Sequence, residues 1–306
     1  MYLLERIFEA RKRKKSGFVL ALGGGGGRGL AHLGVLDVLE QHHLKPDAIV
    51  GSSIGAMFGA MYAITPDAAA VIRRAEEILA SDLFASLDLS MLETNGAQDQ
   101  SWLGRMSSAA KQALLYTRAA TERSVADIDI LTDIVFSFCG GESFEDAKIP
   151  VYVTAVAFPS GECHIFSATS GVKLPCAVAA SMAIPGVFEP LKIDGVQYVD
   201  GGVASDLPAK EAQMVANAEQ LVLAVNVGAR PREDVEPSNV YGMRDWSAQI
   251  QALYLRKYNK AFADVLIEPL VGFTQWQDFS NPEQEIEKGR QAALEKIPEL
   301  IEKLDV

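Results

Sequence analysis

The sequence is poor in the residues that build disulfide frameworks and metal sites. It contains three cysteines and four histidines among 306 residues. Cys139, Cys163 and Cys176 form no Cys-x-x-Cys pair, and no two histidines have the spacing of metal ligands. Neither a disulfide scaffold nor a metal centre is therefore predicted, and we expect a reducing compartment and no metal or cofactor.

Positive charge is also scarce, because 28 lysines and arginines face 40 aspartates and glutamates, for a net charge of -12. A phosphate backbone requires clustered basic residues, so nucleic acid is not an expected partner. No apolar run approaches the roughly 18 residues of a membrane-spanning helix. Residues 1–15 do not match a signal peptide, because Glu5 and Glu9 interrupt the apolar part and the basic residues follow it. These absences predict a cytoplasmic protein.

Residues 1–17 form a distinct N-terminal segment. Apolar residues recur there at helical spacing, and five basic residues follow at positions 11–15. Two interpretations are open: a peripheral membrane contact through residues 1–15 at the inner face of the membrane, or a short helix packed on the body. The second is favoured, because one short amphipathic turn is a weak signal.

From residue 18 onward, short apolar runs alternate with helical patterns, which is typical of an α/β fold with a mostly parallel sheet. Residues 81–145 differ, because their helical pieces are interrupted by polar and glycine pairs and contain no clear strand. We expect a catalytic domain over 18–230 with a helical cap or lid inserted at about 81–145, and C-terminal helices and a strand over 231–306 that complete the same domain. Strands are predicted at 18–22, 47–50, 151–156, 164–166, 197–199, 221–227 and 265–267, and helices at 30–39, 54–62 and 282–304.

A G-x-S-x-G motif gives the strongest chemical signal. Ser53 stands between Gly51 and Gly55, directly after an apolar strand pattern and before a helical one. A serine there lies on a sharp turn that exposes its hydroxyl, and the flanking glycines avoid a clash of β-carbons. The helix that follows directs its positive end toward a developing anion. We predict Ser53 to be a nucleophile.

A glycine-rich segment follows the first predicted strand and contains G-x-G-x-x-G at Gly24, Gly26 and Gly29. A dinucleotide site is the obvious alternative, but that site needs an acidic residue after the second strand, where this chain has the Ser53 turn. Backbone N–H groups at a helix start bind any oxyanion. We therefore expect Gly25, Gly26 and Gly27 to hold the oxyanion of acyl transfer.

A nucleophilic serine needs a general base, and histidine is the usual one. The histidines of this sequence are His32, His42, His43 and His164. A Ser-Asp-His triad in the usual chain order would need His164 as its last member, which is disfavoured. The alternative is a carboxylate acting directly on serine, and Asp200 follows a predicted strand and precedes Gly201 and Gly202. Such a base works where the site is partly desolvated and the oxyanion is well stabilised.

Together these motifs resemble the patatin-like phospholipase family, the lipid acyl hydrolases with a Ser-Asp dyad. The resemblance covers roughly residues 18–230 and implies a three-layer fold, Ser53 as nucleophile and Asp200 as base. The family often has asparagine a few residues after the base, where this chain has Asp206, and Arg28 is expected to anchor the loop or to meet a lipid phosphate. The matching segments are the oxyanion loop Gly24, Gly25, Gly26, Gly27, Arg28 and Gly29, the elbow at 51–55, the block at 180–188, and Asp200-Gly201-Gly202.

The resemblance implies hydrolysis of a lipid or another acyl ester. Two other functions stay open at this point: a regulatory or scaffolding protein that retains the pocket, and a nucleotide-binding protein that uses the glycine loop. Covalent labelling of Ser53 would separate the enzyme from the nucleotide-binding protein.

Overall fold

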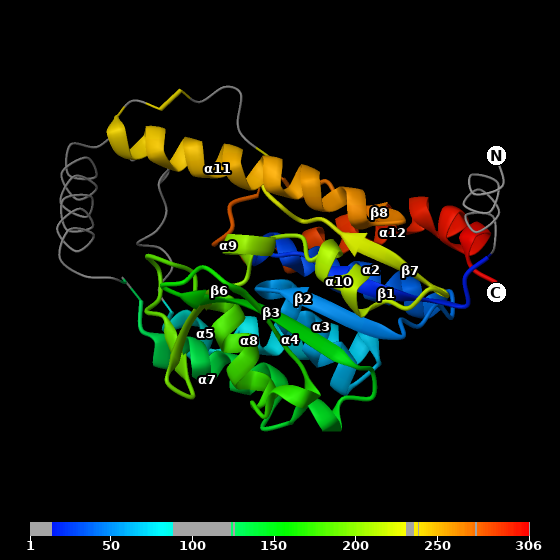
Figure 1. The fold of residues 1–306 in the computed structure, drawn as a ribbon, viewed down its shortest axis with the longest axis horizontal. Coiled ribbons are helices and arrows are strands. Elements are labelled where there is room, and N and C mark those ends of the chain that lie inside the picture. Colours follow the sequence, from blue (N-terminus) through cyan, green and yellow to red (C-terminus); the bar gives the residue numbers. More distant parts are fainter. Residues whose placement is uncertain are drawn as a thin grey trace.

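The computed structural model describes residues 14–87, 124, 126–230, 236–237, 239–272 and 274–305. Within them, eight strands form one sheet in the order β5-β6-β3-β2-β1-β7-β8, with β4 paired to β3 (Figure 1). The five neighbouring strands β3, β2, β1, β7 and β8 are parallel to one another. Strands β4 and β6 pair antiparallel with β3, and β5 pairs antiparallel with β6. The strands are β1 (Gly17–Leu22), β2 (Ala48–Ser52), β3 (Val151–Phe158), β4 (Cys163–Phe166), β5 (Leu191–Ile193), β6 (Val196–Asp200), β7 (Gln220–Val225) and β8 (Val265–Ile267).

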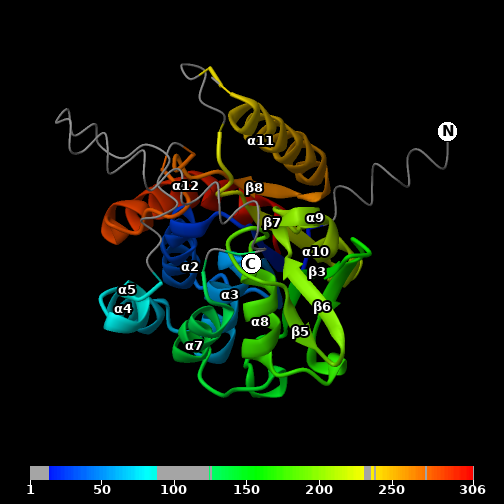
Figure 2. The ribbon, with the colours of Figure 1, turned by 90° about the vertical axis from the view of Figure 1, so that its left-hand side faces the viewer.

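The sheet is the middle layer of three, as expected. One face carries the larger core, which buries Leu20, Ile49 and Leu223 against helices. The other face carries a smaller core in which Val19, Val50 and neighbouring residues pack on Leu207, Ala209 and Ala212. The helices of the first face are α2 (Ala31–Gln41), α3 (Ile54–Ile64), α4 (Ala68–Leu79), α7 (Ile128–Cys139), α8 (Leu174–Met182) and α12 (Pro282–Lys303), and those of the second are α9 (Gly202–Ser205) and α10 (Ala209–Val215) (Figure 2).

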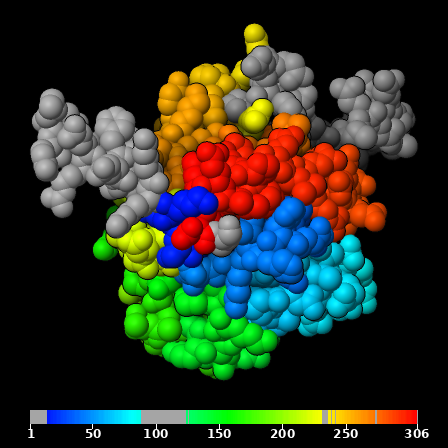
Figure 3. Space-filling view, turned by 90° about the vertical axis from the view of Figure 1, so that its right-hand side faces the viewer, coloured from blue at the N-terminus to red at the C-terminus, as the bar shows by residue number. Residues whose placement is uncertain are grey.

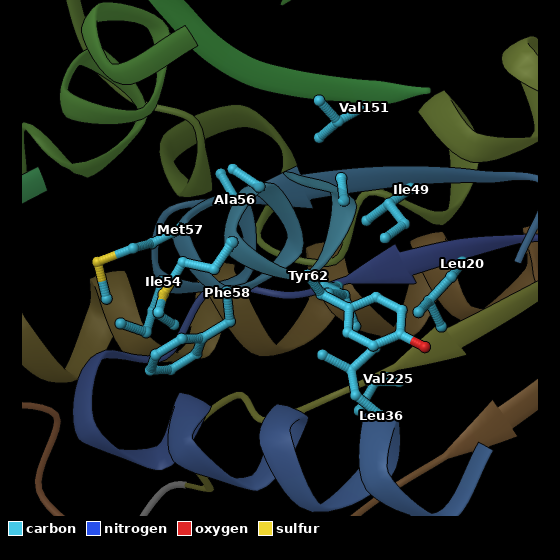
Figure 4. Packing of buried hydrophobic residues seen from close by; sticks show 14 of the residues in the cluster. Leu20, Leu36, Ile49, Ile54, Ala56, Met57, Phe58, Tyr62, Val151 and Val225 are labelled. Atoms are coloured by element: carbon cyan, nitrogen blue, oxygen red, sulfur yellow. The ribbon is translucent and has the colours of Figure 1, made fainter. Parts of the chain in front are cut away.

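Helix α3 lies at the centre of the larger core. Tyr62 points from α3 toward Leu36 of α2 and Val225 of β7, whereas Phe58 lies on the side of Ile54 (Figure 4) and packs edge-on against Phe138 of α7. Almost every residue of α3 is buried, because the helix is covered by the sheet on one side and by α2, α7 and α8 on the others. The helix that begins directly after Ser53 is therefore held in place by the core itself.

The C-terminal helix α12 packs along α2 at the surface (Figure 3). Close approach depends on two glycines, since a Cβ at Gly34 would lie 2.7 Å from the backbone nitrogen of Arg290, and one at Gly289 would overlap the backbone of Ala31. No helix of the described ranges is both long and apolar enough to cross a bilayer.

The segment predicted as a cap is only partly described. α5 (Asp82–Ala85) and α7 lie within it, and α7 buries Leu131, Val135 and Phe138 in the main core. Its apolar stripe is covered by α3 and α8, so residues 128–139 belong to the helical layer and not to a cap. Residues 88–123, the centre of the predicted insertion, and residues 1–13 of the N-terminal segment lie outside the described residues, and both interpretations stay predictions.

Candidate active site

Ser53 occupies a strained turn between β2 and α3. Its φ and ψ are 54° and −125°, a conformation that side-chain-bearing residues rarely adopt. The turn is possible because its neighbours lack β-carbons: a Cβ at Gly51 would lie 2.6 Å from the nitrogen of Ala56, and one at Gly55 would lie 2.7 Å from the carbonyl oxygen of Gly23. The elbow geometry follows locally from the G-x-S-x-G motif.

A side chain from another helix holds the elbow. The backbone N–H of Ser53 donates to Oγ of Ser181 at 2.8 Å, and Ser181 is fully buried in α8. Ser181 belongs to the 180–188 block of the sequence, for which no individual role was predicted. Its hydroxyl satisfies a backbone donor that the irregular turn leaves free.

The hydroxyl of Ser53 donates to Oδ2 of Asp200 at 2.6 Å. The sheet brings them together: β2 and β6 flank β3, where Ser52 is opposite Thr154 and Asp200 is opposite Ala155. The two side chains therefore meet although 147 positions separate them in the chain.

Asp200 lies in a desolvated position, with 6% of its surface exposed. Burial raises the pKa of Asp200 to about 7, and the hydrogen bonds from Ser53 and from the Gly202 N–H (2.7 Å to Oδ1) only partly offset this increase. Gly201 leaves room for the strand beside it, because a Cβ there would overlap Thr154. Asp200 can thus exchange a proton near neutral pH.

The glycine loop lies against the nucleophile, since a Cβ at Gly24 would be 3.4 Å from Cβ of Ser53. Two of its N–H groups are already used: Gly24 donates to the carbonyl of Asp206 and Gly27 to the carbonyl of Trp276, both at 2.7 Å. Gly25 and Gly26 are the partly exposed glycines of the loop, and their N–H groups have no acceptor within the described residues. Of the three glycines expected to hold an oxyanion, Gly27 therefore already has an acceptor for its N–H, and Gly25 and Gly26 are the two that could donate to a ligand.

Arg28 points away from solvent. Its Nε donates to the carbonyl of Val227 at 3.0 Å and its Nη1 to that of Thr274 at 2.9 Å, and burial lowers its pKa to about 10. Of the two expectations for Arg28, loop anchoring matches this geometry, and a contact with a lipid phosphate does not. Gly29, one position on, packs against Ile54 at the start of α3.

Asp206 and Arg256 form an ion pair that the sequence did not predict. Oδ2 of Asp206 lies 2.6 Å from Nη1 of Arg256, and both side chains are largely buried. Arg256 belongs to α11 (Val240–Asn259), a helix whose weak apolar pattern did not mark its position in the sequence. The carbonyl of Asp206 also accepts a hydrogen bond from the N–H of Gly24, so Asp206 links the glycine loop to α11.

The histidines take other roles. His32 is fully buried with Nε2 at 2.8 Å from the carbonyl oxygen of Gly23, and burial lowers its pKa to about 4. His164 lies on β4 among the rings of Phe166 and Tyr198. No histidine side chain hydrogen-bonds Ser53 or Asp200 in the described part of the chain, and the same ranges hold no group of three or more potential metal ligands.

The turn at Ser53, its hydrogen bond to Asp200 and the adjacent glycine loop thus lie together on a three-layer α/β fold. The patatin-like phospholipase model matches residues 20–212, and the chain belongs to that family. It is 30% identical over 223 residues to lysophospholipase NTE1 of Yarrowia lipolytica, covering 73% of this chain and 13% of the relative.

Human patatin-like phospholipase domain-containing protein 6 is 28% identical over 250 residues, covering 76% of this chain and 16% of the human protein. The chain thus spans a small part of these relatives. Among solved structures, VipD of Legionella pneumophila matches with a TM-score of 0.51 at 15% identity, over 94% of this chain and 67% of VipD. The likeness to VipD concerns the fold.

Proposed function

We propose that this chain is a serine acyl hydrolase that cleaves carboxylic esters of lipids through a Ser53–Asp200 dyad and an acyl-enzyme. The observation that carries the proposal is the 2.6 Å hydrogen bond from Ser53 Oγ to Asp200 at a strained elbow. The family supports a lipid ester as substrate, and the relatives named lysophospholipase support an ester with one acyl chain.

In the first half-reaction, Asp200 accepts the proton of Ser53 as Oγ attacks the ester carbonyl carbon. The N–H groups of Gly25 and Gly26 stabilise the oxyanion, together with the N-terminal end of α3. Collapse of the tetrahedral intermediate breaks the ester C–O bond, and Asp200 returns the proton to the leaving alcohol. An acyl ester on Ser53 remains.

In the second half-reaction, Asp200 accepts a proton from water as its oxygen attacks the acyl carbonyl carbon. The tetrahedral intermediate releases the fatty acid and Ser53 recovers its proton. A pKa of about 7 makes Asp200 a better-matched base than an exposed aspartate, because proton transfer is most effective when the pKa of the base lies near the working pH.

The test is covalent labelling by a fluorophosphonate probe, followed by assays on a panel of nitrophenyl esters and lysophospholipids. We expect stoichiometric labelling that Ser53→Ala abolishes. Ser52→Ala is the matched control, because Ser52 is the adjacent buried serine and its hydroxyl has no partner in the described structure. Labelling that survives in Ser53→Ala would refute the assignment of the nucleophile.

The same experiment separates the alternatives. Stoichiometric labelling of Ser53 without turnover on any ester would favour a regulatory or scaffolding role. Absence of labelling together with saturable nucleotide binding would favour a nucleotide site at the glycine loop. Membrane contact through residues 1–15 stays a separate prediction.

A further inference from the structure

Helix α11 exposes several large apolar side chains to solvent. Five of the 12 exposed large hydrophobic side chains of the described residues belong to it, and each is at least 44% exposed. Its first half is exposed on every side over residues 243–249. These five residues, here called the α11 apolar face, are Val240, Met243, Trp246, Tyr254 and Tyr258.

The helix is held by polar contacts. Among its described side chains, those that are buried are Arg256 and Asn259. Arg256 pairs with Asp206, and Asn259 donates to the hydroxyl of Ser205, which itself donates to Glu211 at 2.6 Å. α11 runs along the outer side of the body (Figure 1), so its apolar residues are not explained by core packing.

The polar contacts join α11 to the active site. Ser205 and Asp206 lie at the end of α9, the short helix that follows Asp200. Val203, on the same helix, is 55% exposed and extends the apolar surface toward the base. A surface that binds α11 therefore also lies close to α9, where the segment that follows Asp200 is exposed at Val203.

The charge of α11 differs from that of the whole chain. Arg244, Arg256 and Lys257 outnumber Asp245 within the helix, whereas the chain carries a net charge of -12. Nζ of Lys257 lies 4.9 Å from the centre of the Tyr254 ring, an arrangement that places an aromatic body and a charged tip together. Tryptophan, tyrosine and lysine together are typical of side chains at a lipid–water interface.

We propose that α11 docks on a lipid–water interface, with its apolar face among the headgroups, and so presents the Ser53–Asp200 site to lipid in the bilayer. The proposal rests on the proposed function for the identity of the substrate, but the docking itself does not depend on hydrolysis. A lipid surface fits better than a second copy, because a second copy would bring another strongly acidic body close to the first.

The test uses the full chain with the double variant Trp246→Ala/Tyr254→Ala. Sedimentation with phosphatidylcholine vesicles, with and without phosphatidylglycerol, measures binding, and a monomeric nitrophenyl ester measures the dyad. We expect the apparent affinity for vesicles to fall about tenfold or more, since two aromatic side chains leave the interface. Hydrolysis of the monomeric ester should stay within about twofold of wild type, since neither residue contacts the dyad.

The matched control is Leu294→Ala/Ile301→Ala, which removes two exposed apolar side chains from α12. This control should bind vesicles as wild type does. Equal losses in both variants, or unchanged binding in the α11 variant, would overturn the proposal. Loss of binding only when residues 1–13 are removed would assign the contact to the N-terminal segment, and a dimer in light scattering that the α11 variant dissociates would assign the face to a second copy.

The outcomes keep the two proposals apart. If vesicle binding depends on α11 but the fluorophosphonate probe does not label the protein, docking is upheld and the hydrolase is refuted. If the wild type hydrolyses the monomeric ester but does not bind vesicles, the hydrolase is upheld and docking is refuted.

Discussion

Replacing Asp206 by asparagine is expected to lower the pKa of Asp200 and to move the acidic limb of the activity profile to lower pH. Asp206 is one of the groups that raise the pKa of Asp200, after burial. Both carboxylates approach the Cβ position of Gly202, with Oδ1 of Asp200 at 2.9 Å and Oδ1 of Asp206 at 3.4 Å from it. The two oxygens are therefore about 6 Å apart or closer, by the geometry of those two contacts.

At that separation, two unit charges repel by about 3 kcal/mol at an effective dielectric constant near 20, or about two pKa units. Arg256 lies 2.6 Å from Asp206 and compensates much of this repulsion. We therefore expect the pKa of Asp200 to fall by about one unit in Asp206→Asn. Because the deprotonated carboxylate is the base, wild type at pH 6 should retain about a tenth of its maximal kcat/KM and the variant about half.

The partner variant Arg256→Gln should act in the opposite direction. It removes the positive charge and leaves Asp206 uncompensated near Asp200, so the acidic limb should move above pH 7. The double variant should return toward the wild-type profile. The assay is kcat/KM against pH on a monomeric nitrophenyl ester, measured in buffers of constant ionic strength.

A structural role alone would give a different result. Breaking one side of a buried ion pair destabilises by about 3–5 kcal/mol, so each single variant requires a check of folding by circular dichroism. If both single variants lowered activity at every pH without moving the acidic limb, or moved it in the same direction, the electrostatic reasoning would be refuted.

Three further outcomes are expected. Asp200→Asn should raise the thermal unfolding temperature at pH 8 but not at pH 4. The pKa of Asp200 in the folded protein, about 7, exceeds its ordinary value of 3.8. Ionisation of Asp200 therefore lowers the stability of the fold progressively as the pH rises between these values, by up to about 4 kcal/mol. Ser181→Ala should lower both kcat and the free energy of unfolding, the latter by about 1–3 kcal/mol in urea titrations, since the N–H of Ser53 loses its acceptor; unchanged kcat would refute a role in holding the elbow. Gly26→Ala should reduce kcat by about tenfold or more with the fold retained, because φ is +59° and a Cβ would overlap Trp276; wild-type turnover would exclude Gly26 from the oxyanion site.

Much of the architecture was predictable because local patterns determine it. The runs that became β1, β2, β3, β7 and β8 are short and apolar, as buried parallel strands require, and the helix after Ser53 begins where its motif places it. β5 was not predicted, because a three-residue edge strand has too few residues to show a period. Helices were expected over 231–306, but the bounds of α11 were not predicted, since its apolar residues do not gather toward a core.

Helix α7, at one end of the segment predicted as an insertion, shows that a sequence pattern alone does not decide where a helix packs. Polar and glycine pairs within 81–145 suggested a separate insertion, yet α7 buries its apolar stripe under α3 and α8. Whether an amphipathic helix covers the core or forms a lid depends on which partner covers its apolar side. That partner is distant in sequence and is chosen only when the layers assemble.

The sequence by itself determined the elbow at Ser53 and the existence of a glycine loop, because backbone sterics at glycine act over a few residues. Only the tertiary structure brought Asp200 to within a hydrogen bond of Ser53, by inserting β3 between the strands that carry them. The tertiary structure also decided which N–H groups of the glycine loop lack an acceptor among the described residues, since distant carbonyls of Asp206 and Trp276 accept from Gly24 and Gly27. A hydrogen bond across the sheet depends on strand order and register, which no local pattern encodes.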